Sequence, residues 1–447
     1  MPQDPARPLT RIDRWLLLAL LLAVLAFGAL VEVRSAFLKR RMGDLGVYLR
    51  AAWAVRTGGD LYGITDDNEW HYHYPPLLAI LMMPLADPPA GADNGATVPY
   101  GLSVAIWYAF SMLCLAVAAH ALATAIERRS GRVESWSNKR WWQLRLLPAL
   151  FCVPAIGGTL MRGQVNLQVL ALLAGMIALR LRGQRLSAGL CLAGAICLKI
   201  FPAVLLVYPV WRRDWRCLGG CGLGLLLGLV VVPLVALGPG RTITAYQDWT
   251  EVLIRPALAQ GNDQSRAKEL IEVTATDSQS FLAIIHNSRY LDRYQRPFVA
   301  SAGVRRAHWL IGGTLLLVTL AAGGWKEDAS AAGETLFAGM LVLVTILLSP
   351  VCHLHYFCLM LPLLLGMIAC LWQRRSRLGI SWLGMFLLLV VALAVPHLPG
   401  CELLRDIGVA TYGSLVVWLG GICVLIAERR RQTMRIAAQS EGFTAAA

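Results

Sequence analysis

The stretch WLLLALLLAVLAFGALVEV at residues 15–33 is followed, after a short basic segment, by MGDLGVY at residues 42–48. The first stretch is nearly free of charge and, at roughly 1.5 Å per residue, can cross the roughly 30 Å hydrocarbon core of a bilayer. Because no small-residue cleavage site follows Val33, the stretch predicts a retained membrane span rather than a signal peptide. Asp44 then stands just beyond the span, at the start of a segment expected to face water, where a membrane enzyme can place a base.

The composition of the whole chain indicates a polytopic integral membrane protein. Hydrophobic residues make up 57% and charged residues 15% of 447 residues, with a mean hydropathy of +0.57. The formal net charge of +14 comes from short basic clusters between apolar runs, a pattern that membrane topology explains better than nucleic-acid binding. Eleven cysteines are scattered without paired spacing, so neither disulfides nor zinc are expected.

Apolar stretches of spanning length recur along the chain. Further spans are predicted at residues 98–126, 146–161, 165–180, 217–237, 303–323, 335–349, 355–372, 378–396 and 408–427. Lys199-Ile200-Phe201-Pro202 interrupts residues 186–211, leaving halves of about 12 residues that are too short to cross. This segment predicts a helical hairpin that enters the membrane and returns. The predicted fold class is an all-α polytopic membrane protein with about 12 transmembrane or re-entrant helices.

Basic clusters give the orientation of the alternating spans. Five clusters fall on one side: 128–140, 180–185, 212–213, 374–375 and 429–431. The positive-inside rule makes that side cytoplasmic, with both termini there. Lys39, Arg40 and Arg41 are the exception, because they fall outside beside Asp44. The outer face then receives two long loops, 34–97 and 238–302, and the tail at 433–447 is expected to be disordered.

The chemically varied residues gather on the predicted outer loops and turns, and they form five ordered motifs. The first motif runs from Asp44 and Tyr48 through Gly58-Gly59-Asp60-Leu61-Tyr62 to Tyr74-Pro75-Pro76. The other four are Gly163-Gln164-Val165-Asn166, Lys199-Ile200-Phe201-Pro202, Asp277-Ser278-Gln279-Ser280, and Ser349-Pro350 followed by His355. Each is weak alone, but the ordered set across residues 44–356 resembles the family 87 glycosyltransferases. Position 353 holds His where that family often has Trp, and position 278 holds Ser where Asn is frequent.

The resemblance implies a GT-C fold: one multi-helix membrane domain over residues 1–447, with extracytoplasmic loops that carry short amphipathic helices. It also implies a cell-membrane enzyme that takes a hexose, typically mannose, from a polyprenyl-phosphate donor and passes it to a lipid or glycan acceptor. No glycine-rich phosphate loop follows a predicted strand, which argues against a nucleotide-sugar site. Membrane lipids are the other expected partners, and no nucleic acid, cofactor or metal is expected.

Asp44 is the candidate catalytic base. An inverting sugar transfer needs one group to take the acceptor's hydroxyl proton, and one carboxylate suffices when the leaving group is already a stable phosphate anion. The family's catalytic Asp matches Asp44. The alternative is that Asp44 caps a helix beginning at Leu45.

The leaving phosphate needs positive charge or hydrogen-bond donors near the outer surface. His355 is the second candidate catalytic residue, and Lys199, Arg162, Arg40 and Arg41 are candidates for binding the donor phosphate. The alternatives are a histidine satisfied by a neighbouring carbonyl at His355, an ion pair with Asp44 at Lys199, and an arginine that only reaches the interface at Arg162.

Sugar hydroxyls require directional hydrogen bonds rather than charge. Eight further residues are therefore expected to bind the sugar or the acceptor: Tyr48, Tyr62, Tyr74, Gln164, Asn166, Gln279, Ser280 and His353. The polar members of this set can equally cap membrane helices. The pairs His71 with His73 and His353 with His355 invite a metal interpretation, but neither has a clear third ligand.

Two predictions remain open at this stage. Residues 255–297 are too polar to span and are expected to form short amphipathic helices over the site. A transporter or lipid flippase also has many spans and broken helices. Such a protein should show matching breaks in its two halves, whereas only the hairpin at Lys199–Pro202 is broken by proline here. The pattern favours the transferase.

Overall fold

The structure is a computed structural model, and it describes residues 10–38, 42–92, 97–129, 138–255, 278–326, 330–373 and 380–444. Within these ranges the regular elements are helices, and the extended pairs are two isolated bridges, Thr65 with His71 and Ser278 with His353. The predicted all-α polytopic fold is confirmed.

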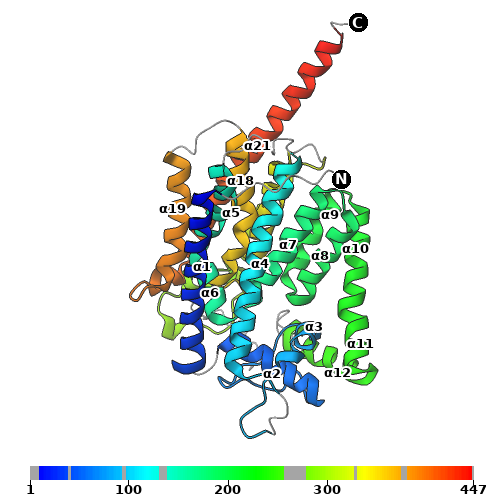
Figure 1. The fold of residues 1–447 in the computed structure, drawn as a ribbon, viewed down its shortest axis with the longest axis vertical. Helices are drawn as coiled ribbons and strands as arrows, with labels where there is room; N and C mark the ends of the chain where they lie inside the picture. The colour runs from blue at the N-terminus through cyan, green and yellow to red at the C-terminus, as the bar shows by residue number, and fades with distance from the viewer. Residues whose placement is uncertain are drawn as a thin grey trace.

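The long helices run side by side through a bundle (Figure 1). In chain order they are α1 (Arg11–Glu32) with the π-turn η1 (Val33–Leu38), α4 (Tyr100–Arg129), α5 (Asn138–Phe151), α6 (Val153–Arg162), α7 (Asn166–Leu181), α8 (Arg185–Leu198), η3 (Phe201–Leu206) with α9 (Val207–Trp211), α10 (Trp215–Leu226) with η4 (Leu227–Val231) and α11 (Val232–Leu237), α16 (Ala302–Gly323), α17 (Ala331–Leu348), η7 (Leu354–Met360) with α18 (Leu361–Gln373), α19 (Ile380–Ala394) with η8 (Val395–His397), and α21 (Val409–Thr444).

Shorter helices lie at one end of this bundle. They are α2 (Gly43–Thr57), α3 (Pro76–Leu81) with η2 (Met83–Leu85), α12 (Pro239–Trp249) with η5 (Thr250–Ile254), α15 (Phe281–Arg289), η6 (Arg293–Gln295) and α20 (Glu402–Asp406). The start of α1 and the end of α21 lie toward the top of Figure 1, whereas α2, α3 and α12 lie at the bottom. The two predicted outer loops therefore share one end, which we call the Asp44 end, and the termini share the other, the terminal end.

Seven of the described helices are long and apolar enough to cross a membrane, and a bent pair raises the number to as many as eight. The bent pair is α5 and α6, which meet at 64°. Pro154, at the start of α6, removes a backbone donor and explains the break, so the prediction that proline breaks only the hairpin at Lys199–Pro202 was wrong. Helices α7, α8, α9 and α19 are apolar but shorter. The predicted total of about 12 transmembrane or re-entrant helices is not confirmed as a count.

The hairpin predicted at residues 186–211 is present. Arg185, at the start of α8, has its guanidinium 3.6 Å from the carboxylate of Asp214, which follows α9. The chain therefore enters along α8, turns at Lys199 and returns along η3 and α9 to the same end. The tip of the hairpin points toward the Asp44 end, where Lys199 becomes available to the outer turns.

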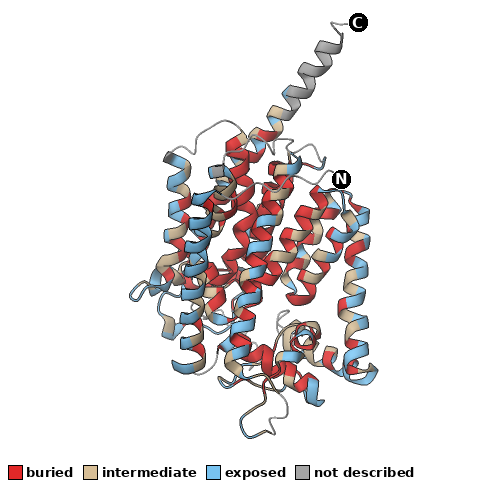
Figure 2. Cartoon of the chain, viewed as in Figure 1, coloured by how far each residue is buried: buried red, intermediate tan, exposed pale blue. Residues whose placement is uncertain are grey.

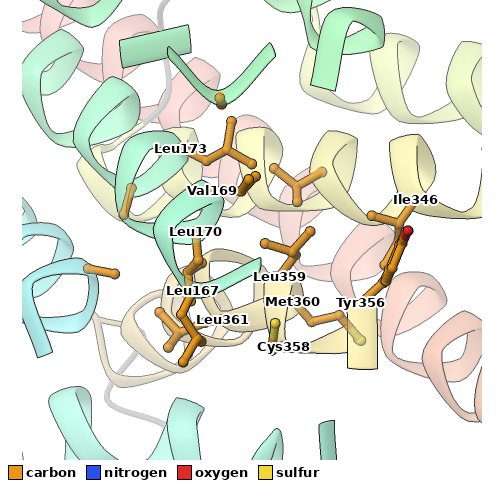
Figure 3. Close-up of a cluster of buried hydrophobic side chains, with 14 of the residues drawn as sticks. Leu167, Val169, Leu170, Leu173, Ile346, Tyr356, Cys358, Leu359, Met360 and Leu361 are labelled. Carbon is orange, nitrogen blue, oxygen red and sulfur yellow. The ribbon is translucent and has the colours of Figure 1, made fainter. Parts of the chain in front are cut away.

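The core of the bundle is apolar and continuous. Helices α17 and α18 are buried along their whole apolar windows, whereas the window of α1 is only 6% buried, as expected for a helix facing lipid (Figure 2). Figure 3 shows leucines and valines of α7 packed beside Leu359, Met360 and Leu361 of η7 and α18. This packing fixes α7 against the turn that carries His353 and His355.

Two predictions for the ends of the first and last spans were wrong. The segment after Asp44 does not face water: it forms α2, in which residues 45–52 are buried, because the helix packs against α3 and α6. The tail expected to be disordered from residue 433 instead continues α21 to Thr444. Its sequence, TMRIAAQSE, is rich in residues with high helix propensity, so the helix propagates.

Candidate active site

Asp44 lies in the first turn of α2, outside the candidate spans. The helix begins at Gly43 with Met42 at the N-cap position, so the alternative that Asp44 caps a helix starting at Leu45 was wrong. A carboxylate in a first turn is favoured by the helix dipole. Its oxygen Oδ1 accepts a hydrogen bond of 2.6 Å from Nε2 of Gln164. Asp44 is therefore held by a neutral amide.

Gln164 reaches Asp44 because of the tight turn between α6 and α7. Gly163 ends α6 with φ +70°, and a Cβ at this position would lie 2.6 Å from Cβ of Leu45. Only glycine fits both requirements. Trp107 also donates from Nε1 to the carbonyl of Gly163 at 2.8 Å, which fixes the turn against α4. The buried Gln164 side chain consequently points at the start of α2.

Lys199 meets the same turn from the tip of the hairpin. Its side chain is only 3% exposed, and Nζ donates to Oε1 of Gln164 at 3.1 Å and to Oδ1 of Asn166 at 2.8 Å. The ring of Tyr356 lies 3.9 Å from Nζ and contributes a cation–π contact. A buried ammonium needs such partners. Here they are amide oxygens and an aromatic face, and Gln164 links Lys199 to Asp44.

His355 closes the site from the start of η7. Its carbonyl accepts from Oγ1 of Thr159 at 3.0 Å and from Nδ2 of Asn166 at 3.3 Å. The His355 ring stacks on that of His353, with centroids 5.4 Å apart and planes 16° apart. The backbone of residue 355 is therefore tied to α6 and to the start of α7, and the two imidazoles form one stacked pair.

Tyrosines from the first loop complete the cluster. The hydroxyl of Tyr48 donates to Oε1 of Gln164 at 3.0 Å and lies 3.3 Å from the hydroxyl of Tyr74. Tyr62 is one step removed, since its hydroxyl donates to the carbonyl of Tyr74 at 2.9 Å. We use the name Asp44 cluster for eight side chains: Asp44, Tyr48, Tyr74, Gln164, Asn166, Lys199, His355 and Tyr356.

Gln279 and Ser280 lie beside the cluster, on a segment joined to it by the backbone. Ser278 pairs with His353, and the amide of Gln279 donates to the carbonyl of Cys352 at 2.5 Å. The Ser280 hydroxyl accepts from the amide of Ala283 and caps α15, as the capping alternative predicted. Gln279 is fully buried, and its Nε2 donates to the carbonyl of Arg405 at 2.7 Å. Both side chains therefore have structural roles in this conformation.

Burial and the surrounding positive charges have opposite effects on the pKa of Asp44. Loss of hydration on burial raises the pKa of Asp44, while Arg162, Lys199, His353 and the hydrogen bond from Gln164 each act to lower it. Arg162, at the exposed end of α6, is the largest of these opposing influences. The site thus combines one carboxylate that holds its proton more tightly than usual with three basic side chains around it.

The structure brings together most of the predicted residues but leaves some aside. Arg40, Arg41 and Asp277, with residues 256–276 of the predicted amphipathic loop, lie outside the described residues. Among the described residues, no group of three or more His, Cys, Asp or Glu side chains is placed to hold a metal ion. Sequence reasoning missed Tyr356, whose only signal was its position directly after His355 in the motif.

Comparison with known proteins identifies the family of this chain. A sequence profile of glycosyltransferase family 87 matches residues 72–350. The chain belongs to glycosyltransferase family 87. The match spans the turns that carry Gln164, Asn166 and Lys199, whereas Asp44 lies 28 residues before it and His355 lies five residues after it. Membership makes the chain a glycosyltransferase, and the candidate spans make it a multi-pass membrane enzyme.

Two similar proteins come from Mycobacterium tuberculosis. In strain ATCC 25618 / H37Rv, a polyprenol-phosphate-mannose-dependent alpha-(1-2)-phosphatidylinositol mannoside mannosyltransferase is 26% identical over 81% of this chain and 75% of its own length. In strain CDC 1551 / Oshkosh, a polyprenol-phosphate-mannose-dependent alpha-(1-2)-phosphatidylinositol pentamannoside mannosyltransferase is 26% identical over 85% of this chain and 78% of its own length.

Among solved structures, ArnT from Cupriavidus metallidurans, bound to undecaprenyl phosphate, superposes with a TM-score of 0.39 and 16% identity. The match covers 94% of this chain and 80% of ArnT.

Proposed function

We propose that this family 87 glycosyltransferase has the GT-C fold. It transfers a hexose, which we propose to be mannose, from a polyprenyl-phosphate donor to a hydroxyl of a glycolipid or glycan. The chemistry takes place at the Asp44 cluster with inversion at the anomeric carbon. Two observations support the donor: both mycobacterial relatives are named for dependence on polyprenol-phosphate mannose, and the cluster lies at one end of a membrane bundle. A lipid-linked donor can reach such a site from within the bilayer.

The proposed step is a single displacement. The acceptor oxygen forms a bond to the anomeric carbon while the bond from that carbon to the phosphate oxygen breaks. The acceptor's proton passes to the Asp44 carboxylate, and the polyprenyl phosphate leaves with the bonding electron pair. Lys199 and Arg162 are the two positively charged side chains that lower the pKa of Asp44 most, and they are proposed to stabilise the departing phosphate.

The observation that carries this proposal is the arrangement of Asp44, Gln164 and Lys199. One amide donates to the carboxylate and accepts from the ammonium, so the base and the cation are held near each other without neutralising each other directly. A base and an anion-binding group that face a common reacting centre need such a separation. His355, beside Asn166, is proposed to orient the sugar or donate to the phosphate.

We further propose that the enzyme lies in the cell membrane with both termini in the cytoplasm and the Asp44 end outside. The terminal end carries Arg182, Arg213, Arg216 and the arginines at 429–431, consistent with the positive-inside rule. The two proposed extracytoplasmic regions, 34–97 and 238–302, supply the short helices at the opposite end apart from α20, and residues 1–447 form one domain.

Donor identity is testable in membranes from cells that express the full chain. Radiolabelled polyprenyl-phosphate mannose should label a product, which is then identified, whereas radiolabelled GDP-mannose should not when synthesis of the lipid donor is blocked. The Asp44→Asn variant should accumulate normally and transfer no label. Direct use of GDP-mannose by the purified enzyme would refute the proposed donor, and full activity of Asp44→Asn would refute the proposed base.

A further inference from the structure

A groove lies between α16 and α21 at the terminal end, away from the Asp44 cluster. It encloses about 760 Å³. Its walls are mostly apolar, with Val318 on α16 and Ile422, Ile426 and Met434 on α21, and two guanidinium groups, those of Arg429 and Arg430, lie between Ile426 and Met434 along α21.

Polar contacts at both ends hold the two walls together. The indole of Trp418 donates to Oγ1 of Thr319 at 2.9 Å, about one helical turn deeper than Ile422. At the other end, Arg429 donates to the carbonyls of Ala321 and Ala322 at 3.1 and 3.2 Å. These carbonyls belong to the last turn of α16, where a cation is favoured by the helix dipole. The groove is therefore a built feature rather than a chance gap between helices.

Gly324 allows Arg429 to take this position. It ends α16 with φ +64°, and a Cβ there would lie 2.4 Å from the Arg429 guanidinium. Arg430, the next residue, is exposed at the mouth of the groove. The eight residues that line the groove include two arginines and no acidic side chain. The mouth is thus positive while the walls below it are apolar.

This combination matches the chemistry of a lipid rather than that of a free anion. Basic pockets between membrane helices bind anionic head groups, and each cation near the membrane surface contributes on the order of 1 kcal/mol. A free phosphate would use the arginines and leave the apolar walls uncovered. We propose that the groove binds one anionic glycerophospholipid, with an acyl chain against Val318, Ile422 and Ile426 and the phosphate at Arg430 beside Arg429. The proposal is independent of the transfer reaction.

The test uses the full chain, purified and stripped of lipid, with binding followed by native mass spectrometry. Dioleoyl phosphatidylglycerol should bind about fivefold more tightly than dioleoyl phosphatidylcholine of the same chain length. Arg430→Gln should lower the affinity for phosphatidylglycerol about fivefold and leave phosphatidylcholine unchanged. Ala321→Trp, which fills the groove from the exposed face of α16, should weaken both. Arg216→Gln, an exposed arginine of α10 at the same end, is the matched control and should change neither.

Three results would overturn the proposal. Equal affinity of the wild type for the two lipids, or equal behaviour of Arg430→Gln and Arg216→Gln, would show annular lipid only. Displacement of phosphatidylglycerol by an equal concentration of glycerol 3-phosphate would assign the arginines to a free phosphate. A wild-type dimer that Ala321→Trp dissociates would assign the groove to a second copy of the chain.

Discussion

Two buried groups of charges, one at each end of the bundle, are arranged in opposite ways. At the terminal end, Glu334 accepts from Arg180 at 2.8 Å, from Arg212 at 2.8 Å and from the Tyr208 hydroxyl at 2.8 Å, while Arg180 also bonds Asp214 at 3.0 Å. At the Asp44 end, the carboxylate and the ammonium of Lys199 are bridged by the neutral side chain of Gln164.

The difference separates a structural network from a reactive one. Charges that neutralise each other directly fix the helices that carry them, and they have nothing left to offer a ligand. Charges that are held apart by an amide keep a strong interaction available for a substrate that enters between them. Variants of these two groups should therefore fail in different ways: those around Glu334 by unfolding, and those around Asp44 and Lys199 by loss of transfer.

Glu334→Gln should have the largest effect on stability. It removes the carboxylate on which Arg180 and Arg212 converge, and breaking a buried ion pair costs about 3–5 kcal/mol. Thermal unfolding in detergent should show this loss, while transfer per folded molecule stays near that of the wild type. Glu251→Gln is the control, because its pair with Arg255 is exposed and contributes only about 0.3–0.5 kcal/mol. Equal stability of the two variants would contradict a structural role for the charges around Glu334.

Lys199→Met should lower transfer by about 10²–10³-fold, the range seen when one preorganised donor to a developing anion is removed. The thermal stability should fall by less than in Glu334→Gln, because methionine fills a similar volume and removes a buried charge, although Oδ1 of Asn166 loses this donor. The measurement is kcat/KM for the lipid donor together with a melting curve. Unchanged transfer would show that Lys199 only stabilises the hairpin, in the way that Arg180 stabilises α7.

Gln164→Leu tests the amide bridge itself. Loss of the amide leaves Asp44 and Lys199 each without one partner. A lost partner at a buried polar group costs about 1–3 kcal/mol, and where that cost falls on the transition state it lowers transfer by roughly 5- to 150-fold. Gln168→Leu is the matched control on α7, because Gln168 is buried and bonds only to the Ser111 hydroxyl among the described contacts. If both variants lost transfer equally, the loss would come from disturbed helix packing and not from the bridge between Asp44 and Lys199.

Arg162→Gln should produce the smallest effect, a modest loss of transfer, because this exposed guanidinium is screened by water, together with a shift in the pH profile. Asp44 must be ionised to act as a base, so transfer falls as the pH drops through its raised pKa. Arg162 is the largest influence that lowers this pKa, so its removal raises the pKa further and moves the acidic limb of kcat/KM to higher pH. Arg56→Gln, at the exposed far end of α2, should leave the limb in place. A shift to lower pH would contradict the assignment.

The sequence predicted the fold best where hydrophobicity alone decides structure. Every predicted span has a helical counterpart, and the hairpin at Lys199 followed from two halves too short to cross. Prediction was poorer where packing decides: α2 was expected to face water, but contacts with α3 and α6 bury it. Nothing in the local sequence of α2 carries that information.

The candidate site shows the same division. The turns with Gln164, Asn166, Lys199 and His355 were identified from their motifs, and the structure brings them to one place. The role of Tyr356 as an aromatic partner for Lys199 depends on how η7 packs against the hairpin, and it could not be read from spacing. Ser280, by contrast, proved to be the helix cap that its type and position already allowed.

The central claim is that Asp44 is the base of the transfer reaction, and it is tested most directly by transfer from radiolabelled polyprenyl-phosphate mannose with purified enzyme in proteoliposomes. Asp44→Asn should lower kcat by about 10²–10⁴-fold with an unchanged melting temperature. Asp60→Asn is the control, since that exposed aspartate of the same loop accepts from the amides of Tyr62 and Gly63 and has no contact with the Asp44 cluster among the described residues; it should retain full activity. Equal activity of the two variants would contradict the account.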